Sequence, residues 1–412
     1  MAGMDSLVTR TDAGWRLPAV PNLHSHAFQR AMAGMAERRT DPADSFWTWR
    51  ETMYRFAGRM TPDTMRDVAA QLYVEMLEAG YGSVCEFQYV HHQPDGTPHD
   101  DPAAMSLALA EAARETGIRM TLLPVLYMTG GFDGRPLGER QARFGHDVEG
   151  YLRLLDRLRG LEDRNLKVGA CFHSLRAVPE PAMREVLAAL PRSMPVHIHI
   201  AEQIGEVQDC LALREARPVE WLCANFDVDA RWALVHATHL TAEETRAIAG
   251  SGATVVLCPT TEANLGDGLF PLRDYLDAGG RWGIGSDSHI SVSPVEELRW
   301  LEYGQRLVSR HRNIAVRESE SVGETLLQGA VEDKRAITAV DVSGDWVELD
   351  PGSPVLAGAN GTDVVDRWVF SGNRNLVRTV QVDGQVVVTD GRHRNRDDIA
   401  QRYRQAIKQL LA

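Results

Sequence analysis

Histidines and carboxylates occur in this sequence in short clusters suited to binding a metal ion. His24 and His26 form an His-x-His pair near the start of the chain, and His199 is followed three residues later by Glu202. Residues i and i+2 of a β-strand face the same side, so His24 and His26 can approach one point. Two unrelated histidines at a polar strand end would give the same pattern, so the pair alone does not establish a metal site.

The elements that must position these residues alternate along the chain. Eight short apolar runs end in polar residues, and stretches with helical periodicity follow them. The runs are VPNLHSH, YGSVCEFQYVHH, RMTLLPVLYM, LKVGACFHS, PVHIHIAE, WALVHATH, ATVVLCPTT and RWGIGSDSH. Continuous apolar strands are typical of a parallel sheet covered on both faces. Eight strand–helix units predict an α/β fold, a (β/α)8 TIM-type barrel. A doubly wound open sheet is the alternative, although no Gly-x-Gly-x-x-Gly follows an early strand.

Chemically active residue types lie at the carboxyl ends of these runs. In a barrel all of these ends open onto one face, where active sites lie. Core packing does not explain them, because the inside of a barrel needs apolar layers. The residues are His24, His26, Glu86, Tyr89, His173, His197, His199, His236, His239 and Asp287.

A catalytic zinc takes imidazole and carboxylate ligands and keeps one position open for water. Three imidazoles come from His24, His26 and His199, and Asp287 adds a carboxylate that can be both ligand and base. We therefore expect one divalent ion, zinc by preference, although iron or nickel would take the same ligands. A second ion would need a bridging acid or modified lysine at the end of the fourth run, where His173 stands instead.

The pattern changes after about residue 310. The segments WVELD, DRWVFSG and LVRTVQVDGQVVVTDG are predicted strands, and Asp383-Gly384 is a strong hairpin signal. We expect a barrel over residues 20–330, a small β domain from residues 1–19 and 335–392, and a C-terminal helix over residues 393–412.

Composition excludes several classes of function. The chain has 44 Lys and Arg against 57 Asp and Glu, a net charge of −13, which argues against a nucleic-acid partner. No apolar run approaches the roughly 18 residues that a membrane helix needs, and the N-terminus lacks the apolar core of a secretory signal. The five cysteines are scattered, which is typical of reduced thiols in a cytoplasmic protein.

The order of His-x-His, His, His and Asp over eight strands resembles the amidohydrolase superfamily. Longer segments resemble, within it, the deiminases that act on N-formimidoyl-L-glutamate. These are NLHSHAFQRAMAGMAE, SFWTWRETMYR, CFHSLRAVP, HIHIAEQ, VHATH, TEANLGDG and GSDSHISVSPVEELRWLEYGQRL, which together span roughly residues 20 to 312.

The resemblance implies a role for each residue of the metal cluster. His24, His26, His199 and Asp287 would hold the metal, and Asp287 would accept a proton from the attacking water. Glu202 would pass a proton to the imine nitrogen of the substrate; the alternative is a carboxylate at a helix start. His236 would stabilise the water or the oxyanion, unless it is a core histidine bonded to a neighbour.

Substrate contacts are implied in the same way. A formimino derivative of glutamate carries two carboxylates, which arginine forks bind in bidentate fashion. The matching residues are Gln29, Arg50, Tyr89, His173 and Arg176. An arginine taken alone is more often a solvated surface charge, but the motifs around Arg50 and Arg176 favour the pocket. The expected partner is a small anionic substrate derived from an amino acid, and we expect a homodimer.

The chain departs from the family pattern at its start. Family members usually begin with some thirty more residues that pair with the C-terminal β segment, so a reduced or rearranged appendage is expected. An amidohydrolase that acts on another formimino, guanidino or heterocyclic amine substrate is therefore the main alternative. A deaminase of an aromatic base would need stacking aromatics in place of two arginines. A non-catalytic barrel would lack a ligand or an acid, and none is missing.

Overall fold

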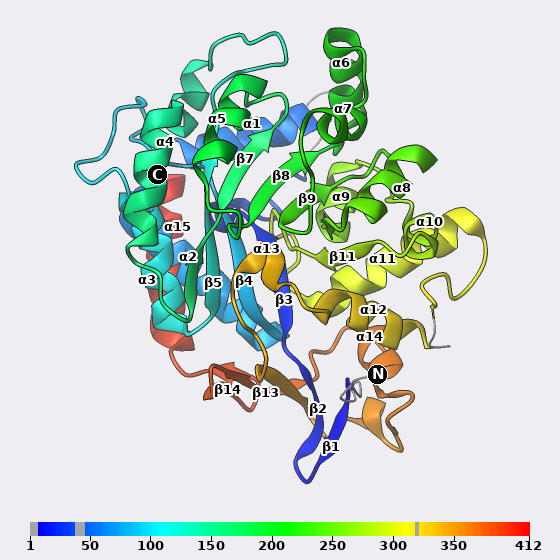
Figure 1. The fold of residues 1–412 in the computed structure, drawn as a ribbon. Helices are drawn as coiled ribbons and strands as arrows, with labels where there is room; N and C mark the ends of the chain where they lie inside the picture. The colour runs from blue at the N-terminus through cyan, green and yellow to red at the C-terminus, as the bar shows by residue number, and fades with distance from the viewer. Residues whose placement is uncertain (1–6, 38–45, 318–320) are drawn as a thin grey trace.

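The computed structural model describes residues 7–37, 46–317 and 321–412, and its centre is a barrel of parallel strands (Figure 1). The strands are β3 (Val20–Ser25), β4 (Tyr81–Gln88), β5 (Arg119–Leu126), β6 (Leu166–Val168), β7 (Ala170–Ser174), β8 (Val196–Ile200), β9 (Trp232–His236), β10 (Thr254–Leu257) and β11 (Arg281–Ile284). They pair in the order β11-β10-β9-β8-β7-β5-β4-β3, with β6 on β5. An isolated parallel bridge between Ser25 and Asp287 joins the two ends. All eight predicted runs therefore form strands, and the barrel prediction is confirmed.

Helices surround the barrel. They are η1 (Ala27–Met32), α1 (Phe46–Ala57), α2 (Pro62–Ala79), α3 (Ala104–Thr116), η2 (Glu139–Phe144), α4 (Val148–Arg159), α5 (Glu180–Ala189), α6 (Ile204–Arg214), α7 (Pro218–Asn225), α8 (Ala242–Ser251), α9 (Pro259–Leu265), α10 (Leu272–Asp277), α11 (Pro294–Ser309), α12 (Val322–Val331) and α13 (Arg335–Thr338). In α2, the Thr61 side chain caps the first turn and Gly80 ends the helix at φ 109°. Only glycine adopts that backbone angle readily.

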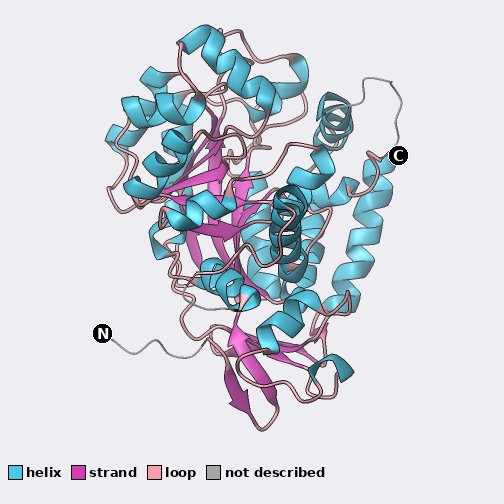
Figure 2. Cartoon of the chain, turned by 90° about the vertical axis from the view of Figure 1, so that its right-hand side faces the viewer, coloured by secondary structure: helices cyan, strands magenta, loops and turns pink. Residues whose placement is uncertain are grey.

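A second sheet lies at the amino-terminal end of the barrel (Figure 2). Its order is β1 (Thr9–Thr11), β2 (Gly14–Pro18), β12 (Trp346–Leu349), β13 (Val377–Val382), β14 (Gln385–Thr389) and β15 (Arg392–His393), all antiparallel. Asp383 and Gly384 both have positive φ, 54° and 73°. These angles suit a two-residue type I′ turn, which confirms the predicted hairpin. The appendage therefore combines residues from both ends of the chain.

One predicted strand is wrong, because the segment DRWVFSG lies largely in a helix, α14 (Val364–Phe370). Val364, Val365, Trp368 and Val369 are its buried residues. This i, i+1, i+4, i+5 spacing is helical, and the buried face packs on α11 and α12. Bulky and β-branched residues had favoured a strand, but their periodicity decides the outcome.

The chain ends in helix α15 (Arg396–Leu411), which packs on α2. A short 3-10 turn, η3 (Pro354–Leu356), precedes α14. His393, expected at the start of the terminal helix, belongs to β15 instead. The division of the chain into three domains stays a prediction. Within the described residues, no helix combines the length and the apolar character needed to cross a membrane.

Candidate active site

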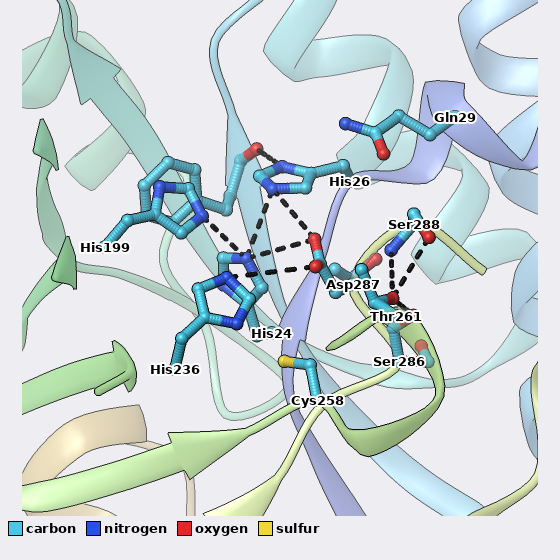
Figure 3. A network of polar contacts seen from close by, with 12 residues as sticks. His24, His26, Gln29, His199, His236, Cys258, Thr261, Ser286, Asp287 and Ser288 are labelled. Atoms are coloured by element: carbon cyan, nitrogen blue, oxygen red, sulfur yellow. Dashed lines mark hydrogen bonds and ion pairs between the residues drawn. The ribbon is translucent and has the colours of Figure 1, made fainter. Parts of the chain in front are cut away.

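Four of the predicted ligands meet at the carboxyl-terminal end of the barrel (Figure 3). His24 Nε2 lies 3.1 Å from His26 Nε2 and 2.9 Å from His199 Nε2. Asp287 Oδ1 lies 3.2 Å from His26 Nε2 and 3.5 Å from His24 Nε2. Side chains from the first, fifth and eighth barrel strands therefore surround one point.

Hydrogen bonds on the far side of two rings fix where their protons lie. His26 Nδ1 donates to the Phe87 carbonyl at 3.0 Å, and His199 Nδ1 donates to the His173 carbonyl at 2.9 Å. With the proton at Nδ1, the neutral form of each ring has its lone pair at Nε2, the arrangement that metal-binding histidines use. Burial lowers the pKa of His24 to about 3, so this ring is neutral too. Converging lone pairs and a carboxylate suit a divalent cation.

Backbone conformation at the strand ends helps to aim the side chains. His236, the last residue of β9, has φ 69°, and Asp287, just after β11, has φ 47°. Positive φ is costly for residues with a Cβ and persists only where the surroundings hold it. At Asp287 the surroundings include two backbone hydrogen bonds across the barrel closure, from Asp287 N to His24 O and from His26 N to Asp287 O.

His236 lies among three carboxylates. Its Nδ1 contacts Glu262 Oε1 at 3.2 Å, and its Nε2 is 3.8 Å from Glu202 Oε1 and 3.9 Å from Asp287 Oδ2. Burial acts to lower the pKa of His236, but these carboxylates outweigh it and raise the pKa to about 10. Burial also raises the pKa of Glu202. The site thus holds a cationic imidazole beside a carboxyl group that binds a proton more readily than usual.

A single cavity brings the predicted residues together. Its lining comprises His26, Gln29, Trp49, Arg50, Met53, Tyr54, Tyr89, Tyr127, Phe144, His173, Arg176, His199, Glu202, His236, Thr261, Leu265 and Asp287. Every predicted catalytic and substrate-binding residue is present, as are three of the four predicted metal ligands. The fourth, His24, is fully buried behind them.

The predicted substrate residues come from different loops and are held by one another. Gln29, in η1, donates its amide hydrogen to the Tyr89 hydroxyl at 2.9 Å. Arg176, just after β7, donates from Nη1 to the Tyr127 hydroxyl at 3.2 Å. Arg50 lies on α1, with its guanidinium carbon 5.1 Å from the centre of the Tyr54 ring. Both arginines thus reach the same cavity against tyrosine rings.

Three other polar strand ends lie outside the metal cluster. His197 points toward the opposite end of the barrel, where Nε2 donates to the Ile337 carbonyl at 2.7 Å. His197 therefore lies away from the metal cluster. Glu86 accepts hydrogen bonds from the Ala27 amide and the Ser25 hydroxyl, which secures the end of β3. His239 is partly exposed and belongs to none of the groups that could hold a metal among the described residues.

Two residues of the site received no role from the sequence. Glu262 holds His236 and also accepts the Cys258 amide at 2.9 Å. Its segment, TEANLGDG, was noted for the resemblance, and its position directly after β10 was the available signal. Tyr127 follows β5, and the polar end of the run RMTLLPVLYM was the corresponding signal.

Comparison with known proteins decides the family. The amidohydrolase family model matches residues 16–324. The chain belongs to the amidohydrolase family. It is 52% identical over 404 residues to the formimidoylglutamate deiminase of Pseudomonas aeruginosa, covering 96% of this chain and 89% of the relative. A more distant amidohydrolase relative, the 8-oxoguanine deaminase of the same organism, is 25% identical over 71% of this chain and 64% of its own.

Solved structures agree with this assignment. The crystal structure of an amidohydrolase from Brucella melitensis superposes with a TM-score of 0.92 at 43% identity, covering 98% of this chain and 96% of that one. An adenosine deaminase from Xanthomonas campestris, solved with bound zinc, has a TM-score of 0.79 at 20% identity and covers 96% and 86%. The second likeness shows the amidohydrolase fold alone. The family uses a divalent metal, in keeping with the histidine and aspartate cluster.

Proposed function

We propose that this enzyme hydrolyses N-formimidoyl-L-glutamate to N-formyl-L-glutamate and ammonia, with one divalent ion, zinc, per chain. The observation that carries the proposal is one cavity whose lining includes both the hydrolytic groups and two arginines. A relative that is 52% identical and named formimidoylglutamate deiminase supports the same substrate.

The metal residues would be His24, His26, His199 and Asp287, whose ligand atoms converge as described above. A divalent ion there would bring the pKa of a coordinated water molecule close to neutrality and polarise the formimino group. Asp287 takes the proton of the attacking water. Glu202 gives a proton to the imine nitrogen, which makes the formimino carbon a better electrophile.

The rest of the reaction follows from proton balance. The water oxygen bonds to the formimino carbon, and the protonated His236 faces the negative charge that develops on this oxygen. The nitrogen takes up a second proton by way of Asp287 or Glu202 and departs as ammonia. The oxygen stays on carbon as the formyl carbonyl, so both hydrogens of the water end on ammonia.

Recognition of the glutamate part falls to other residues of the cavity lining. Arg50 and Arg176 offer fixed positive charge, and Gln29, Tyr89 and His173 offer polar contacts. A guanidinium fork suits a carboxylate, since two parallel N–H donors meet two oxygens. A purine or pyrimidine has no carboxylate for the two guanidinium groups to bind, which disfavours an aromatic-base substrate.

Ammonia release from a panel of substrates tests this function. The panel contains formimidoylglutamate, formimidoylaspartate, guanine and cytosine at equal concentrations with purified, zinc-loaded enzyme. We expect the highest kcat/KM with formimidoylglutamate and no release from the two bases. Release from a base, or none from either formimino compound, would overturn the proposal.

A further inference from the structure

Tyr127 occupies a position in the cavity wall next to the arginine side. It follows β5 and is 2% exposed. Its ring meets that of His173 edge to face, with centroids 4.3 Å apart, and His173 in turn contacts the metal-side His199 at 5.2 Å. Two ring contacts therefore separate Tyr127 from the metal cluster, and it lines the part of the cavity that Arg176 also lines.

The hydroxyl of Tyr127 accepts two hydrogen bonds. Arg176 Nη1 donates to it at 3.2 Å, and Gln141 Nε2 donates at 2.9 Å. The guanidinium has no acceptor atom. The orientation of the Gln141 amide is also fixed, because its Oε1 accepts the Gly138 amide at 3.0 Å. Both neighbours of the phenol are therefore donors, and neither can take its hydrogen.

The hydrogen of this phenol consequently has to point elsewhere. A phenolic oxygen has two lone pairs and one hydrogen, and both lone pairs are already used. Within the described part of the chain, no residue accepts this hydrogen, and the ring lines the substrate cavity. Donation by Arg176 and Gln141 also polarises the O–H bond and makes it a stronger donor. Tyr127 is thus a cavity-lining residue whose hydroxyl still has a hydrogen to donate, beside the positive charge of Arg176.

We propose that Tyr127 donates a hydrogen bond to the substrate carboxylate that Arg176 binds, and so determines specificity for that carboxylate. This inference rests on the proposed function, since it places a formimidoylglutamate carboxylate at Arg176. A carboxylate can accept both an N–H from Arg176 and the O–H from Tyr127. It would therefore supply the acceptor that the Tyr127 hydrogen does not have among the described residues. A neutral amide in the same place accepts more weakly and brings an NH2 group toward donors that cannot accept it.

Steady-state kinetics of Tyr127→Phe test the contact. The substrates are formimidoylglutamate and its two monoamides, one amidated on each carboxylate. Hydrogen bonds to charged groups predict a loss of roughly 10- to 150-fold in kcat/KM with formimidoylglutamate. We expect most of the loss in KM, because the contact lies away from the reacting carbon. One of the two monoamides lacks the carboxylate that Arg176 binds, and it is identified because Arg176→Met has little effect on its kcat/KM. With that monoamide, Tyr127→Phe should also have little effect.

A second comparison separates direct contact from support of Arg176. In an Arg176→Met background, a direct donor still contributes, so adding Tyr127→Phe should lower kcat/KM further. If the double variant equals Arg176→Met, Tyr127 acts only by positioning the guanidinium, and the direct contact is overturned. Equal losses with both monoamides and formimidoylglutamate would overturn it as well.

Two controls complete the experiment. Tyr303→Phe removes a phenol from the exposed face of α11 and should leave the kinetics unchanged. Calorimetric binding of N-formyl-L-glutamate, which has the same carboxylates, should weaken in Tyr127→Phe in proportion to kcat/KM.

Wild-type enzyme that releases no ammonia from formimidoylglutamate would contradict the proposed function. Active wild type with an unchanged Tyr127→Phe variant would contradict this inference alone.

Discussion

Glu202 and His236 lie side by side in the site, with Glu202 Oε1 and His236 Nε2 3.8 Å apart. One is a partly buried carboxyl group with a raised pKa, and the other is an imidazole that its carboxylate neighbours keep protonated. A raised carboxyl pKa is what a group needs to carry a proton between water and a basic imine nitrogen. In the proposed mechanism Glu202 therefore transfers the proton, and His236 faces the oxygen on which negative charge develops.

Glu202→Gln keeps the size of the side chain and removes its ability to transfer a proton. We expect kcat to fall by about 10² to 10⁴, the usual contribution of a general acid or base. Metal content should be unchanged, because Glu202 is not among the converging ligand atoms. Ammonia release and elemental analysis of the same preparation check both statements, and near-normal turnover would mean that Glu202 is structural.

Arg50→Met should raise KM for formimidoylglutamate strongly. One charge-assisted hydrogen bond is worth roughly 1.5 to 3 kcal/mol, which corresponds to a loss of about 10- to 150-fold in kcat/KM. The comparison of wild type and variant, each with formimidoylglutamate and a monoamide, is a double-mutant cycle between protein and ligand. If Arg50→Met lowers kcat/KM equally with formimidoylglutamate and with both monoamides, Arg50 does not bind a carboxylate. Another formimino, guanidino or heterocyclic amine substrate would then be favoured.

The sequence predicts the barrel strands better than it predicts the short helices and the contacts between elements. The eight barrel strands follow from apolar runs. Their polar ends include the residues that meet, but also His197, Glu86 and His239, which lie outside the metal cluster. The role of Glu262 is not evident from the runs: its place shortly after β10 marks it as a candidate, but its contact with His236 joins α9 to β9, which a run does not show. Helix α14 was mistaken for a strand because a seven-residue segment offers barely two helical turns in which to detect a period.

A buried ion pair lies between the barrel and the second sheet. Arg119 on β5 donates to both oxygens of Asp345, at 2.6 and 3.1 Å, and both residues are buried. Asp345 also accepts the Asp383 amide at 2.8 Å, next to the β13–β14 hairpin. Barrel strand and hairpin are thus attached to the same carboxylate.

Arg119→Met should destabilise the protein by about 3 to 5 kcal/mol, because it leaves Asp345 charged, buried and unpaired. Arg119→Met combined with Asp345→Asn should recover part of this loss. Arg378→Met, which removes an exposed partner of Asp390, serves as the control and should cost less than about 1 kcal/mol. Urea unfolding of the three variants measures the differences, and equal losses for Arg119→Met and Arg378→Met would refute a special role for the buried pair.

Metal binding should stabilise the whole molecule. A ligand that binds only the folded state adds about 4 kcal/mol when its free concentration is 1,000-fold above Kd. Chelation should therefore lower Tm and abolish ammonia release, and one equivalent of zinc should restore both. Elemental analysis should give one divalent ion per chain, and either two tightly bound ions or full activity without metal would be inconsistent with this site.

The barrel closes where the site lies, and this affects how the protein is made. Asn22 before the first ligands and Ser286 beside the last ligand contact each other across 264 residues of chain, and the Ser25–Asp287 bridge adjoins them. At ribosomal rates of about 5 to 20 residues per second, His24 leaves the ribosome on the order of 10 to 50 s before Asp287. During that interval the nascent chain exposes an incomplete set of imidazoles and an unpaired first strand. We therefore expect the growing polypeptide to capture a divalent ion only when nearly the whole barrel has been synthesised, and a truncated chain to lack a complete site for it.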